Sequence, residues 1–126
     1  MYEFFKVIGD ETRLRCLAIV VNHHEVCVCE LVAALDLPQS RISRHLALIK
    51  SEGIIRQRRK NQWVLYSLHS SLSHFKHQLL EETVVELLKS RVYQQDNQRL
   101  LNMKNRPKID CRKQRHELLC CTEERK

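Results

Sequence analysis

The sequence predicts a mainly α-helical protein with a small β-hairpin, and two observations support this fold class. Apolar residues recur at helical spacing along most of residues 2–92, whereas only residues 54–59 and 63–68 read as strands. The 126 residues include 2 Gly and 2 Pro, too few for a loop-rich or all-β protein. We expect one domain over residues 1–95 and a basic, cysteine-containing, mostly disordered tail over residues 96–126.

Three helices are expected before residue 37. Residues 2–8 are apolar and aromatic and predict a short helix. Asp10 or Thr12 can cap a second helix, which we expect to end at residues 22–24. Its apolar stripe is formed by Leu14, Leu17, Ala18 and Val21. A third helix fits residues 28–36.

The fourth helix, from Gln39 to about Ser51, has two different faces. At about 100° per residue, its apolar face is formed by Ile42, Leu46 and Ile49. The opposite face is small and polar and is formed by Ser40, Ser43, Arg44 and Ala47. Such a face can enter the major groove of DNA, where bulky apolar side chains would clash and acidic ones would be repelled.

A β-hairpin with a basic tip follows this helix. Its strands, residues 54–59 and 63–68, are expected to be joined by a turn at residues 60–62. A supporting helix, a reading helix and a basic hairpin together make a winged helix-turn-helix, in which the hairpin reaches flanking phosphates. The expected partner is therefore double-stranded operator DNA.

A long helix is expected after the hairpin, from Ser70 or Ser71 toward Val92. Its apolar stripe is formed by Leu72, Phe75, Leu79, Val84, Leu87 and Leu88. With the helix over residues 2–8, it carries more apolar surface than one small domain would bury. Because operators are usually palindromic, we expect these helices to form a homodimer; the alternative is that they only complete a monomer core.

Positive charge is concentrated in the reading helix and the hairpin. The chain has a net charge of +7, and residues 39–66 hold seven basic residues and one acidic residue, a net of +6. Such a block is typical of a phosphate-binding face, and a solvated surface is the alternative. We expect DNA contacts from Gln39, Ser40, Arg41, Ser43, Arg44 and His45 on the helix and from Arg56, Arg58, Arg59 and Lys60 on the hairpin.

The sequence indicates neither a membrane span nor an export signal. No run approaches the ~18 uncharged apolar residues of a span, and the first residues lack the apolar core and cleavage site of a secretory signal. We therefore expect a cytoplasmic protein without a membrane partner. In that reducing compartment the six cysteines are more often metal ligands or sensors than disulfide partners.

Cys27 and Cys29, in the segment HHEVCVCEL, stand at the start of the expected third helix. Residues two apart in a helix point about 200° apart, so we expect them to share an ion only where the helix start is frayed or unwound. A soft ion that prefers thiolates would then disturb the segment that supports the reading helix. The alternative is a pair of small buried hydrophobic residues, which is what we expect of Cys16.

Other roles for the cysteines stay open. The tail cysteines could supply further thiolates, form a second site or have no role. Oxidation of Cys27 with Cys29, or of Cys120 with Cys121, would instead make a redox-sensing repressor. Another soft metal bound by the thiols would make a different soft-metal-sensing repressor of the same fold. An enzyme is not expected, because the chain shows no βαβ unit, no Cys-x-x-Cys and no Gly-rich phosphate loop.

Three segments resemble one known family. GDETRLRCLAIV, CVCELVAALDLPQSRISRHLALIKSEGII and RQRRKNQWVLYSL resemble the ArsR/SmtB family of bacterial metal-responsive repressors over residues 2–92. EVCVCEL is similar to its arsenic-sensing branch, the repressors of arsenical resistance operons. The resemblance implies a homodimeric winged helix that represses its own operon. It also implies release from operator DNA when trivalent arsenic or antimony (arsenite or antimonite as inducer) binds cysteine thiolates.

One position departs from that branch. Its members usually carry a third cysteine three residues after the Cys-x-Cys, and Val32 stands there in this chain. The metal site implied for Cys27 and Cys29 then either works with two thiolates, which would also suit a methylated arsenical, or is completed from the tail. The candidates for that third ligand are Cys111, Cys120 and Cys121.

Overall fold

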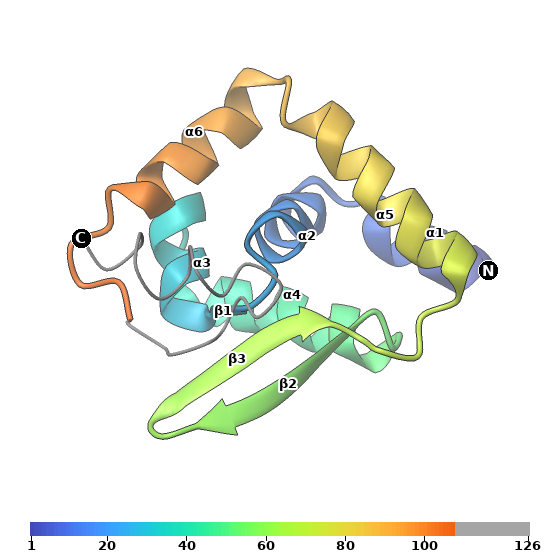
Figure 1. The fold of residues 1–126 in the computed structure, drawn as a ribbon, viewed down its shortest axis with the longest axis horizontal. Helices are drawn as coiled ribbons and strands as arrows, with labels where there is room; N and C mark the ends of the chain where they lie inside the picture. Colours follow the sequence, from blue (N-terminus) through green and yellow to red (C-terminus); the bar gives the residue numbers. More distant parts are fainter. Residues whose placement is uncertain (108–126) are drawn as a thin grey trace, which may run out of the picture.

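The computed structural model describes residues 1–107 of the chain and forms a winged helix-turn-helix over this range, which confirms the predicted fold class (Figure 1). In chain order the elements are α1 (Tyr2–Ile8), α2 (Glu11–His23), β1 (Val26–Cys27), α3 (Val28–Leu35), α4 (Gln39–Ser51), β2 (Ile55–Lys60), β3 (Trp63–Leu68), α5 (His74–Leu87) and α6 (Arg91–Leu101). None of the described helices is long and apolar enough to cross a membrane.

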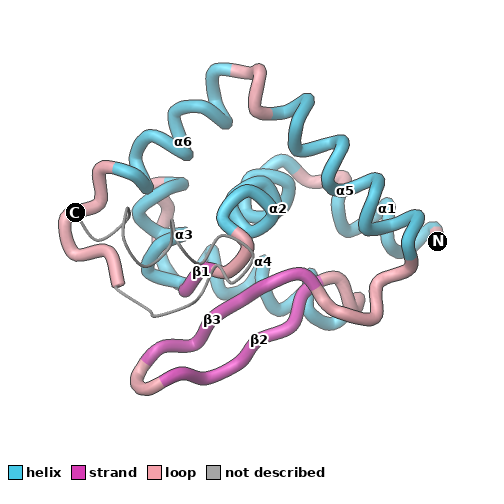
Figure 2. The backbone as a smooth tube through the Cα atoms, viewed as in Figure 1, coloured by secondary structure: helices cyan, strands magenta, loops and turns pink. Residues whose placement is uncertain are grey.

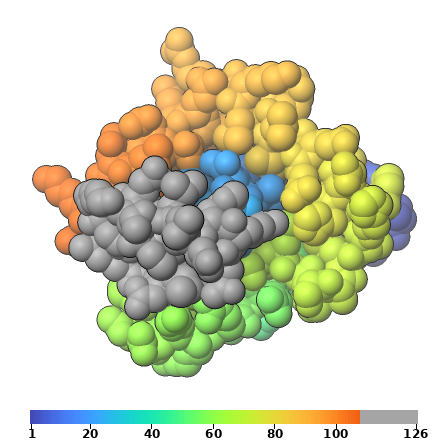
Figure 3. All heavy atoms as spheres, viewed as in Figure 1, coloured from blue at the N-terminus to red at the C-terminus, as the bar shows by residue number. Residues whose placement is uncertain are grey.

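Helix α2 runs through the middle of the fold, with the other helices around it (Figure 1). In the space-filling view a small blue area of α2 is visible beside α5 and α6 (Figure 3). The Asp10 carboxylate caps α2 by accepting a hydrogen bond from the Arg13 backbone N–H at 3.1 Å. The helix ends at the buried His23, within the predicted range of residues 22–24.

The reading helix and the hairpin agree with the prediction. Helix α4 has the expected bounds, and its apolar face is fully buried: Ile42, Leu46 and Ile49. Gly53 follows α4 with a φ of +78°, while a Cβ there would meet no atom within 4 Å, so the left-handed backbone is what favours glycine. A two-residue turn joins β2 to β3, and Asn61 has the positive φ that such turns require.

Strand β1 is an element that sequence reasoning missed. It pairs with β3, so the sheet has the order β1-β3-β2 with antiparallel neighbours (Figure 2). Val26 lies opposite Tyr66, and Cys27 lies opposite Leu65. Two residues are too few to show a period-two pattern, so β1 has no sequence signal of its own.

The predicted long helix after the hairpin is in fact two helices. Helix α5 ends at Leu87, and α6 begins at Arg91 after an extended residue, Ser90. Phe75, which the predicted stripe placed inside, is 54% exposed, whereas Leu80 is buried. Helix α6 has no continuous apolar stripe, because an acidic residue occupies the centre of its buried face, formed by Tyr93, Asp96 and Leu100.

The buried Asp96 carboxylate fastens α6 to the domain. It is 1% exposed and accepts two hydrogen bonds from Arg15, each of 2.8 Å, and one from Arg99 at 2.7 Å. The two guanidinium groups also donate to the last turn of α3, at the Leu35 and Ala34 carbonyls. Because such carbonyls have no partner within their own helix, one cluster joins α2, α3 and α6.

The expected domain boundary after residue 95 falls inside α6. Beyond it, Leu100 is buried and Arg106 contacts Glu30. The packed part of the described chain therefore extends past residue 95. The disordered tail stays a prediction for residues 108–126, which lie outside the described residues.

Replacing Asp96 with Asn should lower the free energy of unfolding by about 3 kcal/mol, because two guanidinium groups lose their charged partner. Urea unfolding at fixed protein concentration measures this change. Asp36→Asn is the matched control: Asp36 is exposed with a φ of +57°, which Asn tolerates, so we expect a change within about 0.5 kcal/mol. Equal stability of the two variants would contradict the role given to Asp96.

Candidate DNA interface and thiol site

The side chains expected to read DNA lie on the exposed face of α4. All but His45 are exposed: Gln39, Ser40, Arg41, Ser43 and Arg44. Within residues 1–107, neither Arg41 nor Arg44 takes part in an ion pair. Their guanidinium groups are therefore available for base edges and phosphate oxygens, which Arg contacts in bidentate fashion.

His45 connects α4 to the N-terminal helices. Its Nδ1 lies 3.3 Å from Arg13 Nη1, and Arg13 Nε donates to the Val7 carbonyl at 2.6 Å. Since a guanidinium only donates, Nδ1 is the acceptor and the neutral ring carries its proton on Nε2. Burial lowers the pKa of His45 and favours this neutral form. His45 therefore orients α4, and its contact with DNA stays a prediction.

The four basic residues of the hairpin have different surroundings. Arg56 and Arg59 are exposed, and neither forms an ion pair within the described residues. Arg58 donates two hydrogen bonds to the Glu25 carboxylate, at 2.6 and 2.9 Å, and this contact raises the pKa of Arg58. Lys60 ends β2 near the tip. One of the predicted phosphate contacts thus already has a carboxylate partner in the same chain.

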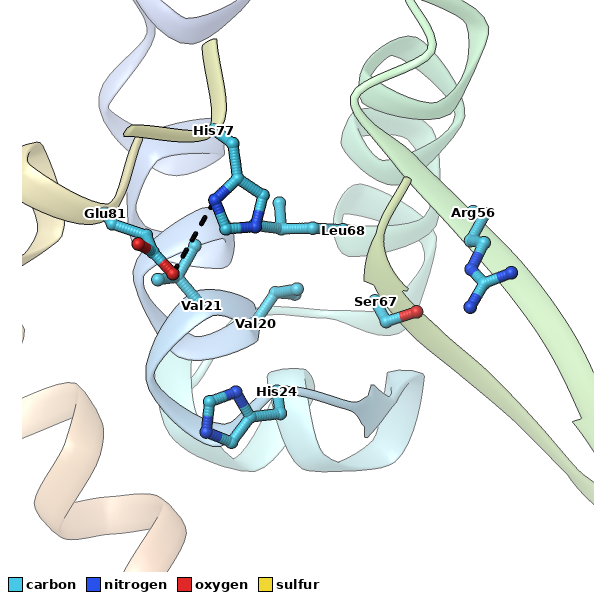
Figure 4. Close-up of a pocket in the computed structure, with 8 residues that line it drawn as sticks. All are labelled: Val20, Val21, His24, Arg56, Ser67, Leu68, His77 and Glu81. Atoms are coloured by element: carbon cyan, nitrogen blue, oxygen red, sulfur yellow. Dashed lines mark ion pairs between the residues drawn. The ribbon is translucent and has the colours of Figure 1, made fainter. Parts of the chain in front are cut away.

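A pocket of about 180 Å³ lies between α2, the hairpin and α5 (Figure 4). Within it His77 and Glu81, one turn apart on α5, form an ion pair of 3.7 Å. The pocket is lined by Val20, Val21, His24, Arg56, Ser67, Leu68, His77 and Glu81. Among the described residues, no group of three or more His, Cys, Asp or Glu side chains could hold a metal ion. The mixed lining of the pocket indicates no particular ligand.

The thiols of Cys27 and Cys29 are hydrogen-bonded to each other, which corrects the expected helical geometry. Cys27 is the N-cap of α3 and has an extended backbone, with φ −99° and ψ 168°, because it also ends β1. Cys29 alone lies within the helix. The separation of two helical positions therefore does not apply, and the thiols meet without any unwinding of α3.

The hydrogen bond makes the two thiols chemically unequal. The Cys27 thiol donates to the Cys29 sulfur, which lowers the pKa of Cys29 to about 7. The same bond, together with burial, raises the pKa of Cys27. Near neutral pH a substantial fraction of Cys29 is thus thiolate, beside a protonated Cys27 thiol. Cys16 is a core residue as predicted, and burial raises its pKa to about 12.

Glu30 and Arg106 hold the backbone of the thiol pair, and sequence reasoning missed both. The fully buried Glu30 carboxylate accepts a hydrogen bond from the Cys27 backbone N–H at 2.9 Å, as half of a capping box. Its other oxygen accepts from Arg106 Nε at 2.6 Å. The three-residue step from Cys27 to an acidic residue is the signal that could have found Glu30. No sequence pattern around Arg106 predicts its contact with Glu30.

An apolar cluster covers the thiol pair on the side of the hairpin. Cys27 and Leu65 are buried together, and Cys29 and Trp63 pack against them. Val32 packs against the main core and belongs to a different cluster. The described part of the chain thus offers two sulfur ligands at this site. Outside the described residues lie the predicted tail ligands, Cys111, Cys120 and Cys121.

Alkylation of Cys29 by iodoacetamide should rise with pH around a midpoint of about 7, because the thiolate is the reactive form. Cys27→Ala removes the donor and should raise the midpoint toward about 8.5, the value of an unperturbed thiol. Cys27→Ser is the matched control, since its hydroxyl still donates and keeps the midpoint below that of the Ala variant. Peptide mass spectrometry resolves Cys29 from the other cysteines. Equal midpoints for wild type and Cys27→Ala would argue against the hydrogen bond.

Comparisons with known proteins agree with this architecture. The family profile described as "Bacterial regulatory protein, arsR family" matches residues 10–57. The arsenic resistance transcriptional regulator ArsR2 of Pseudomonas putida is 41% identical over 109 residues, which cover 86% of this chain and 92% of that protein. The arsenical resistance operon repressor of Escherichia coli is 38% identical over 80 residues, which cover 64% of this chain and 68% of that protein.

A solved structure shares the fold. Reduced HlyU from Vibrio cholerae matches with a TM-score of 0.57 and 28% identity, covering 70% of this chain and 84% of that one. Both sequence relatives are named as regulators of transcription, and the P. putida protein is similar over nearly its whole length. The chain therefore belongs to the ArsR family of bacterial regulatory proteins and is a DNA-binding transcription regulator, not an enzyme.

Proposed function

We propose that the protein represses an arsenical resistance operon in the reducing cytoplasm and leaves its operator when trivalent arsenic or antimony binds Cys27 and Cys29. The observation that carries this proposal is the hydrogen-bonded thiol pair at the junction of β1 and α3, where the pKa of Cys29 is about 7. The names of the P. putida and E. coli relatives refer to arsenic resistance and support the choice of inducer.

On DNA, the exposed face of α4 enters the major groove. Arg44 is the long cationic side chain among small neighbours, Ser40, Ser43 and Ala47, and so can reach a guanine edge. Phosphate contacts come from Arg41 beside this face and from the hairpin. Helix α3 supports α4 by packing against it, so a ligand at the start of α3 changes the position of the reading helix.

We place the homodimer contact on α1 and α5. These helices lie side by side at one end of the fold, where Lys76 Nζ lies 5.0 Å from the centre of the Phe4 ring (Figure 1). Large apolar side chains are exposed on them: Tyr2, Phe5, Phe75 and Val85. Exposed apolar surface of this kind is typical of an interface, and a dimer presents two reading helices to a palindromic operator.

Inducer binding is a condensation with the two thiols. Arsenous acid, As(OH)3, forms one As–S bond to each sulfur, and two of its hydroxide groups leave as water. The first hydroxide takes a proton from solvent, which replaces the one that Cys29 released on ionising, and the second takes the Cys27 proton. The Cys29 thiolate reacts first because its pKa is the lower, and Cys27 loses its proton in the second step. The third position on arsenic then holds a hydroxide, the methyl group of a methylated arsenical, or a tail cysteine.

A second function, redox sensing at the same pair, is favoured by one observation. A thiolate beside a second thiol is suited to forming a sulfenic acid that is then resolved as a disulfide with loss of water. Mass spectrometry after mild peroxide treatment, run beside the arsenite titration, separates the two functions. Operator release that follows peroxide and not arsenite would favour the redox sensor.

Cys27→Ser and Cys29→Ser variants should keep operator affinity and lose release by arsenite, because a hydroxyl is a poor ligand for a soft ion. Fluorescence anisotropy of labelled operator during arsenite titration measures both properties. Wild-type release from either variant would refute the site. A chain ending at residue 107 keeps Arg106 and removes all tail cysteines. Wild-type release from this chain would show that two thiolates suffice, and lost release would assign the third ligand to the tail.

Arg44→Ala should weaken operator binding by roughly 1–3 kcal/mol if Arg44 makes a bidentate base contact. The loss should be smaller on DNA of scrambled sequence, where no base contact is made. Arg41→Ala is the matched control, since an arginine bound to phosphate contributes equally on both DNAs. Gel-shift titration on the two DNAs measures the difference. Unchanged operator affinity of Arg44→Ala would exclude the base contact.

A further inference from the structure

We propose that Arg58 is a positioning residue that locks the hairpin to the strand carrying Cys27, and that it does not bind DNA phosphate. Its partner in this role is Glu25, two residues before Cys27. The ion pair would connect the thiol site to the hairpin. Its link to the inducer rests on the proposed function.

The contact between Arg58 and Glu25 is bidentate: two guanidinium nitrogens of Arg58 donate to the two carboxylate oxygens of Glu25. Arg58 Nε donates to Glu25 Oε2 at 2.6 Å, and Nη2 donates to Oε1 at 2.9 Å. The Glu25 side chain is 9% exposed, whereas that of Arg58 is 45% exposed. To reach a phosphate, the guanidinium would have to give up two short charged hydrogen bonds to a nearly buried carboxylate, which is costly.

The register of the sheet places this ion pair beside the thiol site. Arg58 of β2 lies opposite Leu65 of β3, and Leu65 lies opposite Cys27 of β1. These three residues form one row across the sheet, so their side chains lie on the same face. Leu65 is fully buried in this row and packs against Cys27. The ion pair therefore connects β2 directly to the chain that enters β1.

The chain at Glu25 needs such a contact. His24, just before it, has a φ of +72°, and the Glu25 N–H bonds to the His23 carbonyl at 2.8 Å. This is a γ-turn in a strained region of backbone space, which persists where surrounding contacts hold it. Arg58 supplies a contact from the hairpin, and the ladder between β1 and β3 supplies another. A shift of β1 at the thiol pair is thus passed to the hairpin.

Arg59 provides the contrast within the same strand. It is the next residue of β2, so its side chain lies on the opposite face of the sheet. It is exposed and forms no ion pair among the described residues. Of these two neighbouring arginines, Arg59 is therefore the one that contacts phosphate. Arg58 is the one that orients the hairpin.

Because Glu25 is negatively charged, the direction in which Glu25→Gln changes operator affinity distinguishes two explanations. If only long-range charge mattered, Glu25→Gln would remove a negative group near DNA and tighten operator binding. If Glu25 positions the hairpin through Arg58, the same variant loosens the hairpin and weakens binding. The two accounts therefore predict opposite changes.

The experiment measures operator affinity of the full chain against salt concentration for Glu25→Gln, Arg58→Lys, Arg58→Gln and Arg59→Gln. Arg59→Gln should reduce the salt slope by about 0.9 for each lost phosphate contact, and so by about 1.8 for the proposed dimer, which loses one contact per subunit. Arg58→Gln should leave the slope unchanged and weaken binding at least about fivefold, a typical effect within one coupled network. Arg58→Lys should weaken binding as well, because lysine keeps the positive charge but cannot donate two parallel hydrogen bonds to the Glu25 carboxylate. Glu25→Gln should weaken binding at every salt concentration.

Arsenite titration of the same variants tests the link to the thiol site. The affinity ratio without and with arsenite should be smaller for Glu25→Gln and Arg58→Lys than for wild type, and unchanged for Arg59→Gln. If wild type itself is not released by arsenite, the proposed function fails, while the salt slopes and the sign for Glu25→Gln still decide the role of Arg58. A reduced slope for Arg58→Gln, full binding by Arg58→Lys, or tighter binding by Glu25→Gln would overturn the inference.

Discussion

The backbone of Cys27 ends β1 and begins α3, and the thiol site depends on this double role. The extended angles that let Cys27 pair with Leu65 are also those of a helix N-cap, so strand and helix meet at one residue. Glu30 secures the arrangement by accepting the Cys27 N–H. With that backbone the Cys27 thiol reaches Cys29 and lowers its pKa. A helical Cys27 would break the ladder to the hairpin and separate the two sulfurs.

Sequence patterns located α4 and the hairpin well because their signals are local. Helix α4 repeats its buried positions strictly and is followed by Gly53, where the backbone turns left-handed. The parts that escaped prediction depend on contacts distant in sequence. Helix α6 is held by a buried acid, Asp96, whose arginine partners come partly from α2. The two cysteines could be singled out by type and spacing, but their contact required the strand β1, which is too short to leave a pattern.

The basic residues of segment 39–66 have different surroundings in the fold, although they follow one another in sequence. Arg44 and Arg59 face outward without an ion pair in the described chain, whereas Arg58 is matched by Glu25, which lies outside that segment in sequence. Arg15 and Arg99 likewise serve as internal ties through Asp96 and the end of α3. Net charge counted along a window therefore overstates the charge available to phosphates. An arginine is available to DNA only where the fold places no acidic side chain beside it.

The chain contains one tryptophan, and Trp63 packs against the cluster that holds both thiols. The indole ring is thus placed where a heavy atom bound by sulfur would come near it. Heavy atoms quench indole emission at short range, and a change in packing shifts its colour. The protein consequently carries its own optical probe for the proposed occupancy of the thiol pair. This probe can be read on the unlabelled chain while a dye on the operator reports DNA binding separately.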